Sequence, residues 1–235
     1  MQEAASASLI QDTLLHSVNV LIHVLLGTAA LALGGRQLAA TKGDESHRRF
    51  GRWFLACIWG AVGTAAVGLL VFEFRAFLGV ITLLVAYWAF AGYRTLRLRN
   101  HGPTLTDALG SVAGLGAAGL FVWHLASVQF PWNPSVIYST LGTLVTVATY
   151  DLLRFTFPRR WFATLWRYEH VVKMIGAYSA TLSAFAGTVL GGLQPYSELL
   201  PSVACTAIMI VLLVRVRREG LAGRSRSDLR GATPD

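Results

Sequence analysis

Three polar side chains in the first apolar segment of the chain are the residues best suited to do chemistry. His16, Asn19 and His23 stand at positions i, i+3 and i+7 within residues 14–35, so they share one face of a helix. Neutral imidazole is a ligand for zinc, copper and heme iron, and it titrates near neutral pH. Polar groups are costly in hydrocarbon unless they face protein, water or a bound group, so this face is predicted to line an interior.

Other ionisable residues are expected near the outer surface of the membrane. His124 and Glu73 are predicted at the outer level of His16, whereas His23 lies about 10 Å deeper, near the midplane, at the rise of a helix. Two alternatives stay open. His124 could be an interfacial residue, and a hydrogen bond to a neighbouring helix would satisfy His23.

A second group of ionisable residues is expected at the inner surface. It consists of two histidines and four charged residues: His47, Asp151, Arg154, Glu169, His170 and Lys173. Ion pairing among the four charges would satisfy them near the headgroups, and we favour this interpretation over catalysis. His47 has the alternative interpretation of a solvated loop residue.

Composition indicates a membrane protein. Of the 235 residues, 54% are hydrophobic and 14% are charged, whereas soluble domains carry about 25% charged residues. Cys57 and Cys205 lie in apolar runs and are expected to be small buried hydrophobic residues. The sequence has no HExxH, CxxC, CxxCH or phosphate-loop motif, and its glycine runs follow no strand, so it favours neither a hydrolase triad nor a dinucleotide site.

Seven apolar segments are each close to the roughly 20 residues that a spanning helix needs. They cover residues 14–35, 53–72, 76–96, 105–126, 135–155, 170–192 and 199–216. If seven helices alternate, Arg75 alone of the 20 lysines and arginines falls on the far side, so the N-terminus is predicted outside and the C-terminus in the cytoplasm. The predicted fold is all-α: a polytopic seven-helix transmembrane bundle over 1–218 and a flexible polar cytoplasmic tail over 219–235.

Stripes of small residues predict where helices approach one another closely. The segment 170–192 carries two such stripes, Gly176–Ala180–Ala184 and Ser179–Ser183–Gly187–Gly191, so this helix is expected at the centre of the bundle. The net charge of +8 is explained by topology and by attraction to anionic lipid, so nucleic acid is not an expected partner. The expected partner is the lipid bilayer, with a homo-oligomer or a larger membrane complex left open.

Two stretches of sequence set histidines in distinctive surroundings. HVLLGTAAL begins at His23 and is followed by a glycine pair and by HRRFGR, which begins at His47; HVVKMIGAY begins at His170. These stretches resemble a family of uncharacterised bacterial polytopic integral membrane proteins with HxxxGxxAL…HRRxGR and late HxxxMxGxY motifs. The resemblance covers about half of the chain and implies a multi-pass location in a bacterial inner membrane. It emphasises His23, His47 and His170, but it implies no activity.

The leading hypothesis is binding of heme b or a transition metal at imidazole ligands, for membrane electron transfer, in an interior built by the first, fourth and sixth helices. The candidate cofactor-binding residues are His16, His23, His47, His124 and His170; the candidate metal ligands are His23, His47, His170, Asp151 and Glu169; Asn19 and Lys173 are polar interior residues. A second hypothesis is a proton-coupled transporter or proton-conducting protein, with His16, Asn19 and His23 as the relay or substrate site. A third is a structural or accessory subunit whose polar groups hold helices together.

Overall fold

The protein consists of seven α-helices joined by short connections. The computed structural model describes the backbone of residues 2–72, 74–127 and 134–231, and the side chains of 13–72, 74–125 and 134–218. The helices are α1 (Gln2–Ala39), α2 (Glu45–Val67), α3 (Ala76–Leu98), α4 (Leu105–Ser127), α5 (Pro134–Leu153), α6 (Phe162–Val189) and α7 (Tyr196–Gly231). Short turns of helix lie between them: η1 (Gly68–Phe72), η2 (Arg154–Thr156), η3 (Arg159–Trp161) and η4 (Gly191–Leu193). The described residues contain no strand, so the prediction of an all-α fold with seven helices is confirmed.

Six of the seven helices are long and apolar enough to cross a membrane. The six stretches are Thr13–Ala39, Glu45–Phe72, Ala76–Leu98, Leu105–Leu125, Pro134–Thr156 and Tyr196–Arg218. The exception within the described residues is α6, because Arg167, Glu169 and Lys173 and many small residues lower its hydropathy. It also begins at Phe162 rather than at the predicted residue 170. The predicted segment starts where the apolar residues begin, whereas the helix already includes the charged residues Arg167 and Glu169 before that point.

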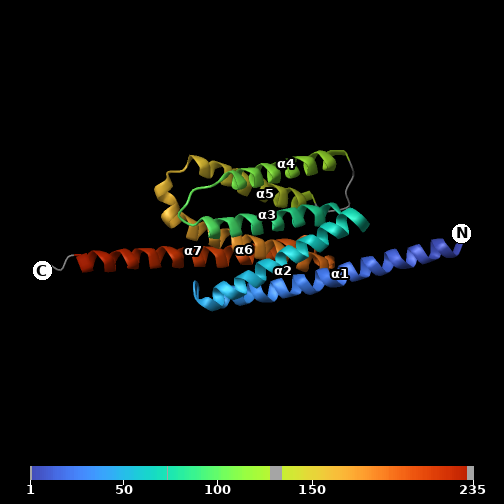
Figure 1. Ribbon diagram of the computed structural model, residues 1–235, viewed down its shortest axis with the longest axis horizontal. Helices are drawn as coiled ribbons and strands as arrows, with labels where there is room; N and C mark the ends of the chain where they lie inside the picture. The colour runs from blue at the N-terminus through green and yellow to red at the C-terminus, as the bar shows by residue number, and fades with distance from the viewer. Residues whose placement is uncertain (1, 73, 128–133, 232–235) are drawn as a thin grey trace.

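The bundle is arranged around α3 and α6. Figure 1 shows α4 and α5 on one side of α3, with α6, α7 and the α1–α2 pair on the other. The main helix contacts are α1 with α2, α3 with α6, α6 with α7, and α4 with α5. Since α6 contacts α1, α3 and α7, its predicted central position is confirmed. The backbone of α7 continues as a helix to Gly231, into the segment for which we predict a flexible tail.

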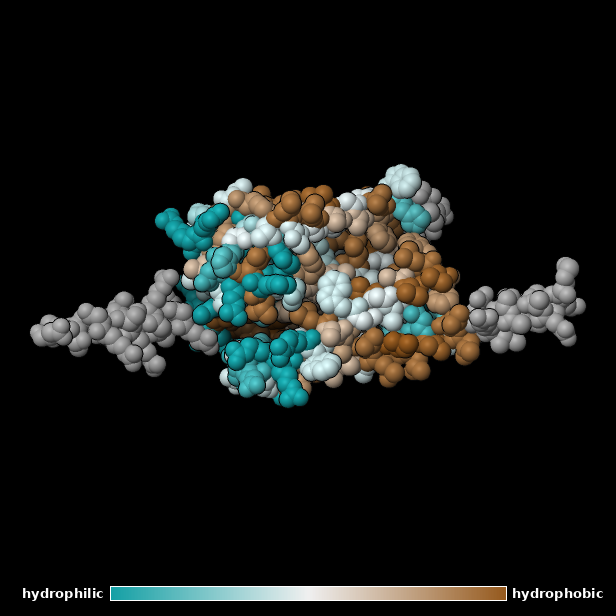
Figure 2. Space-filling model, in the orientation of Figure 1, coloured by the Kyte–Doolittle hydropathy of each residue, from teal (hydrophilic) through white to brown (hydrophobic). Residues whose placement is uncertain are grey.

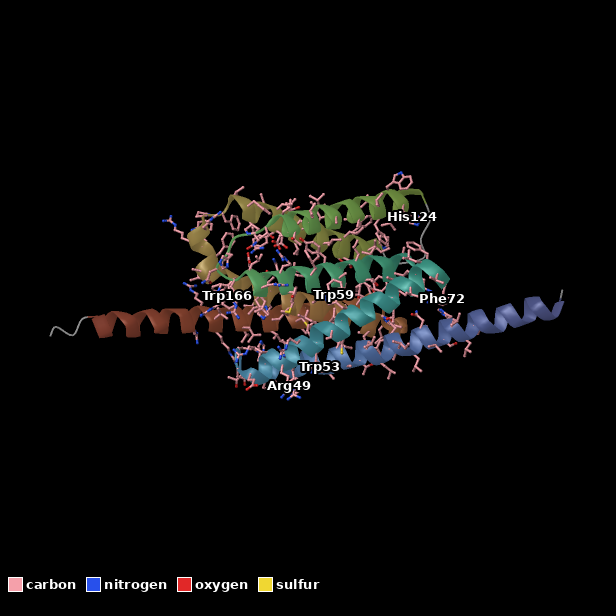
Figure 3. All side chains as sticks on the ribbon, viewed as in Figure 1. Arg49, Trp53, Trp59, Phe72, His124 and Trp166 are labelled. Atoms are coloured by element: carbon pink, nitrogen blue, oxygen red, sulfur yellow. The ribbon has the colours of Figure 1, made fainter. Side chains whose placement is uncertain are left out.

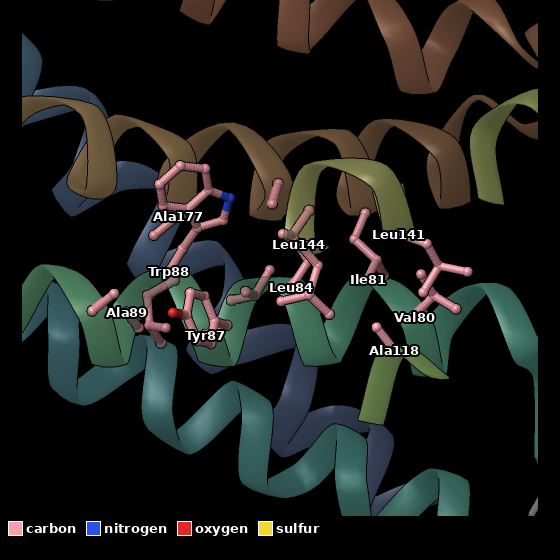
Figure 4. Close-up of a cluster of buried hydrophobic side chains, with 14 of the residues drawn as sticks. Val80, Ile81, Leu84, Tyr87, Trp88, Ala89, Ala118, Leu141, Leu144 and Ala177 are labelled. Carbon is pink, nitrogen blue, oxygen red and sulfur yellow. The ribbon is translucent and has the colours of Figure 1, made fainter. Parts of the chain in front are cut away.

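The core lies mainly along α3. Its side chains pack against α5, α4 and α6, with Val80, Leu84 and Trp88 among the buried residues, as Figure 4 shows. Large apolar residues cover much of the outer surface, for example Leu70 and Leu105, and Figure 2 shows the hydrophobic atoms gathered along the body of the bundle. A surface of this kind is expected for a protein whose solvent is lipid.

Small residues lie where the helices approach one another most closely, as predicted. A Cβ atom added to Gly60 of α2 would stand 2.8 Å from Leu26 of α1. On α6, a Cβ at Gly176 would stand 2.6 Å from the Trp88 ring of α3, and one at Gly187 would stand 2.6 Å from Glu198 of α7. The two small-residue stripes of α6 therefore face two different helices, which is how α6 occupies the centre.

Candidate functional site

His23 and Asn19 tie α1 to α2. The His23 Nδ1 lies 3.0 Å from the Ala61 carbonyl oxygen and 3.1 Å from the Thr64 Oγ1, and the Asn19 amide donates to the Thr64 carbonyl oxygen at 3.1 Å. A carbonyl only accepts, so Nδ1 of His23 carries the proton and Nε2 is the basic nitrogen. A hydrogen bond to a neighbouring helix therefore satisfies one ring nitrogen of His23. This is the alternative to a role for His23 as a ligand.

His16 and His124 each pack against an aromatic ring at the end of the bundle opposite His47. The His16 ring meets Phe72 edge-on with 4.7 Å between centroids, and the His124 ring meets Phe74 edge-on at 5.3 Å. Figure 3 labels Phe72 and His124 on different helices at this end. Glu73, expected beside them, lies outside the described residues.

The structure does not build one interior from α1, α4 and α6. In Figure 1 α3 stands between α4 and α1, and α4 packs on α3 and α5. Short loops favour contacts between helices that are neighbours in sequence, which pairs α4 with α3 and α5. The histidines of these helices consequently fall into separate places rather than around one ligand.

Four charged side chains from α5, η2 and α6 form a buried network. The Lys173 Nζ lies 2.5 Å from Asp151 Oδ1, and the Arg154 Nε lies 2.8 Å from Glu169 Oε1. The Arg154 Nη1 is 3.7 Å from Asp151 Oδ1 and links the two pairs. All four residues are at most 4% exposed, and their charges cancel. The predicted pairing of these residues among themselves is confirmed, and all four are buried among helices.

Neutral polar residues that the sequence analysis missed complete this network. The Tyr87 hydroxyl donates to Asp151 Oδ2 at 3.0 Å, the Tyr150 hydroxyl donates to Glu169 Oε1 at 2.8 Å, and Lys173 donates to the Thr95 hydroxyl at 3.2 Å. Single tyrosines and threonines inside apolar helices carry no signal of their own, so only the three-dimensional arrangement identifies them. A network with this many partners acts first as a structural element.

His47 and His170 lie within range of electrostatic interaction at the other end of the α1–α2 pair. The Asp44 carboxylate caps α2 by accepting from the His47 backbone N–H at 2.6 Å, and this places His47 in the first turn of the helix. The Gln37 side chain of α1 donates to the His47 carbonyl oxygen at 2.7 Å. His170 of α6 lies close enough for its charge to interact with that of His47. The first turn of α2 therefore holds His47, which excludes the loop interpretation.

Three polar atoms of this group are buried without partners. They are the Nδ1 atoms of His47 and His170 and the Oε1 atom of Gln37, none of which has a hydrogen-bond partner in the part of the chain that the structure describes. A buried polar atom left unpaired costs about 1–3 kcal/mol, so such atoms usually face a bound ion, water or ligand. We call Gln37, His47 and His170 the paired-imidazole site.

The paired-imidazole site supplies two nitrogen donors and one amide oxygen. Over residues 13–72, 74–125 and 134–218, no group of three or more His, Cys, Asp or Glu residues is arranged to hold a metal ion. The two carboxylates proposed as metal ligands, Asp151 and Glu169, are paired instead with Lys173 and Arg154. What this site offers a metal is therefore imidazole ligation at two positions, a donor set suited to copper, zinc or iron.

A lysine closes α1 beside this site. The Lys42 Nζ donates to the Gln37 and Leu38 carbonyl oxygens at 2.5 and 3.0 Å, which satisfies two carbonyls at the helix C-terminus. Burial, together with the nearby charge of Arg215, lowers the pKa of the Lys42 ammonium group. The backbone carbonyl of Gln37 is thus occupied, and its side-chain oxygen is the group left for another partner.

Comparison with protein-family models, with curated proteins and with solved structures finds no match for this chain. The resemblance of the histidine motifs therefore stays a prediction. The candidate site rests on the geometry of its own residues, of which His47 and His170 belong to the two motifs that carry that resemblance.

Proposed function

We propose that this protein is a multi-pass membrane protein that binds a redox-active metal, as heme b or as a transition metal ion, for electron transfer in a bacterial inner membrane. The observation that carries the proposal is the pair of buried, unpartnered imidazole nitrogens of His47 and His170. Imidazole ligates heme iron, copper and zinc, so these two ring nitrogens are the candidate ligands. When bound, the metal would supply one-electron chemistry.

Membrane topology forms part of the proposal. We propose that α6 spans the bilayer as a seventh helix, with the N-terminus outside and the C-terminus in the cytoplasm. Its charged residues Glu169 and Lys173 are buried and paired, so its low hydropathy does not expose charge to lipid. Figure 1 places the two termini at opposite ends of the bundle, in keeping with an odd number of crossings. The paired-imidazole site would then lie near the cytoplasmic surface.

The residues of the paired-imidazole site have distinct parts in this proposal. His47 and His170 are the ligands, since they bring one ring nitrogen each from α2 and α6. Gln37 is a positioning residue: its amide N–H holds the His47 backbone, and its buried side-chain oxygen has no hydrogen-bond partner among the described residues. His23 is not part of this ligand set, because its Nδ1 is hydrogen-bonded to Ala61, which lies about four helical turns from His47 along α2.

The test is the absorption spectrum and metal content of purified protein expressed with hemin, iron, copper and zinc supplied. We expect about one metal per chain, and a Soret band if that metal is heme iron. His47→Ala and His170→Ala should each weaken binding by more than about tenfold, and Gln37→Leu by a smaller factor. His101→Ala, an exposed loop histidine that contacts the Leu98 carbonyl, is the matched control and should leave binding unchanged.

Two results would overturn the metal proposal. One is a colourless protein without bound metal under all four supplements, which would leave the polar contacts only to hold helices together. The other is a protein whose metal survives both His47→Ala and His170→Ala but is lost in His23→Ala. That second result would move the site to the α1–α2 contact.

A buried glutamate favours proton-coupled transport as a second candidate function. Glu198, in the first turn of α7, is 3% exposed and packs on Gly187 of α6. Neither of its carboxylate oxygens has a hydrogen-bond partner in the described residues, and the neighbouring Ser197 hydroxyl has none. Carboxyl groups of this kind inside a membrane bind and release protons in pumps and transporters.

For this second candidate we expect dicyclohexylcarbodiimide to label Glu198 in native membranes. The reagent adds to protonated carboxyl groups in apolar surroundings, so Glu198→Gln should abolish the labelling seen by peptide mass spectrometry. Glu169, which is ion-paired with Arg154, is the internal control and should stay unlabelled. Proton flux into liposomes should fall with the same substitution; flux and labelling that both persist in Glu198→Gln would rule the candidate out.

A further inference from the structure

A hollow lies against one face of α2, opposite the face that carries the buried residues of this helix. It has a volume of about 410 Å³ and is lined by Arg49, Arg52, Trp53 and Ala56. These residues stand at positions i, i+3, i+4 and i+7, so they form one stripe along the helix. The buried residues of α2, among them Ile58, lie on the opposite face. We call the four lining residues the arginine hollow.

The arrangement of the helices leaves this face of α2 open. Figure 1 shows α2 crossing α3 near η1 and diverging from it toward Glu45. Figure 3 places Arg49 and Trp53 along the diverging half, and Figure 2 shows hydrophilic side chains gathered at the same end of the molecule. The arginine hollow is therefore open to the surroundings at the polar end of the bundle.

Two guanidinium groups in the arginine hollow have no protein partner. Arg49 and Arg52 are exposed, and neither forms an ion pair or hydrogen bond with another described residue. Arginine presents a planar fork of donors that matches the oxygens of a phosphate. Two such groups one turn apart on a helix line the same hollow, and their unpaired positive charges favour an anionic partner.

The other two residues of the stripe, Trp53 and Ala56, are apolar. Trp53 is 59% exposed, as an interfacial tryptophan is when its ring sits at headgroup level. Beyond Ala56 the same face carries Trp59, which is 44% exposed, and Gly63, where an added Cβ would meet nothing within 4 Å; Gly60 at its edge packs on Leu26 of α1. The stripe thus passes from cationic residues to aromatic and small residues along α2.

We propose that the arginine hollow binds one anionic phospholipid. Arg49 and Arg52 hold its phosphate, Trp53 packs at the glycerol level, and an acyl chain lies along Ala56 and Gly63. Basic pockets between membrane helices bind anionic lipid headgroups in this manner. A second copy of the chain is not the occupant, because a symmetric contact through this face would set four unpaired guanidinium groups against one another.

The experiment compares lipids on the full chain in a neutral detergent. Native mass spectrometry should show phosphatidylglycerol retained, and thermal unfolding should shift upward with phosphatidylglycerol but not with phosphatidylcholine or inorganic phosphate. Arg49→Gln/Arg52→Gln should weaken lipid binding by about 30-fold. The matched control Arg159→Gln/Arg160→Gln removes the same charge from two exposed arginines of η3 and should cost less than about threefold.

A second variant tests whether lipid binding needs the open space of the hollow as well as its positive charge. Ala56→Phe fills the arginine hollow from an exposed position and keeps both arginines, so it should displace the lipid while the protein folds normally. The proposal is overturned if both arginine pairs reduce binding equally, since general attraction to anionic surfaces would then suffice. It is also overturned if inorganic phosphate stabilises the protein as much as the lipid does, or if Ala56→Phe retains the lipid.

Discussion

Lys173→Met is expected to destabilise the folded protein by about 3–5 kcal/mol. The substitution keeps the length of the side chain but removes the ammonium that lies 2.5 Å from Asp151. Asp151 is 3% exposed and would retain only the Tyr87 hydroxyl at 3.0 Å and the Arg154 Nη1 at 3.7 Å. An unpaired carboxylate inside a low-dielectric bundle is far more costly than the missing attraction alone suggests. Unfolding in mixed micelles, followed by circular dichroism, measures the change.

A double variant tests whether charge balance is the cause. Asp151→Asn combined with Lys173→Met removes both charges and keeps an acceptor for Tyr87, so it should recover more than half of the lost stability. Lys42→Met makes the same side-chain change at a lysine that has no ion pair among the described residues; it loses two hydrogen bonds to carbonyls at the C-terminus of α1 and should cost only about 1 kcal/mol. If Lys173→Met is as stable as the parent protein, or the double variant is merely additive, the network is not held by mutual neutralisation.

Much of the fold could be predicted because lipid imposes simple requirements on a sequence. Six of the seven expected segments coincide with helices that are apolar enough to span a membrane. The start of α2 is where this reasoning falls short. An apolar window begins at residue 53, whereas the helix begins at Glu45 behind its Asp44 cap. A helix cap depends on one side chain and one backbone N–H, and a hydropathy average over 20 residues does not detect such a contact.

The candidate site was predictable in its residue types but not in its groupings. His47 and His170 carry the motif resemblance, yet nothing in their spacing says that α2 and α6 bring them together beside Gln37. Helical periodicity relates residues on one helix and says nothing of which helix stands opposite. For the same reason periodicity could not predict the partners of the face that holds His16, Asn19 and His23. Asn19 and His23 contact Thr64 of α2, and His16 contacts Phe72.

Gly176→Leu is the second substitution for which we expect a large loss of stability, about 3 kcal/mol. A Cβ at this position would lie 2.6, 2.7 and 2.9 Å from three carbons of the Trp88 indole, closer than carbon atoms pack. Trp88 is 7% exposed and belongs to the buried core, so its ring is packed among other side chains. Overpacking at such a contact forces helices apart or side chains off their rotamers.

The control for Gly176→Leu is Gly116→Leu on the exposed face of α4, where a Cβ would meet nothing within 4 Å. Because leucine favours a helix over glycine by nearly 1 kcal/mol, this control should be neutral or slightly stabilising. Combining Gly176→Leu with Trp88→Leu makes room on the partner helix and should restore part of the loss. The measurement is thermal unfolding of the parent protein, the two single variants and the double variant in one detergent. Equal stability of Gly176→Leu and Gly116→Leu would mean that α3 and α6 do not approach as closely as the small-residue stripe requires.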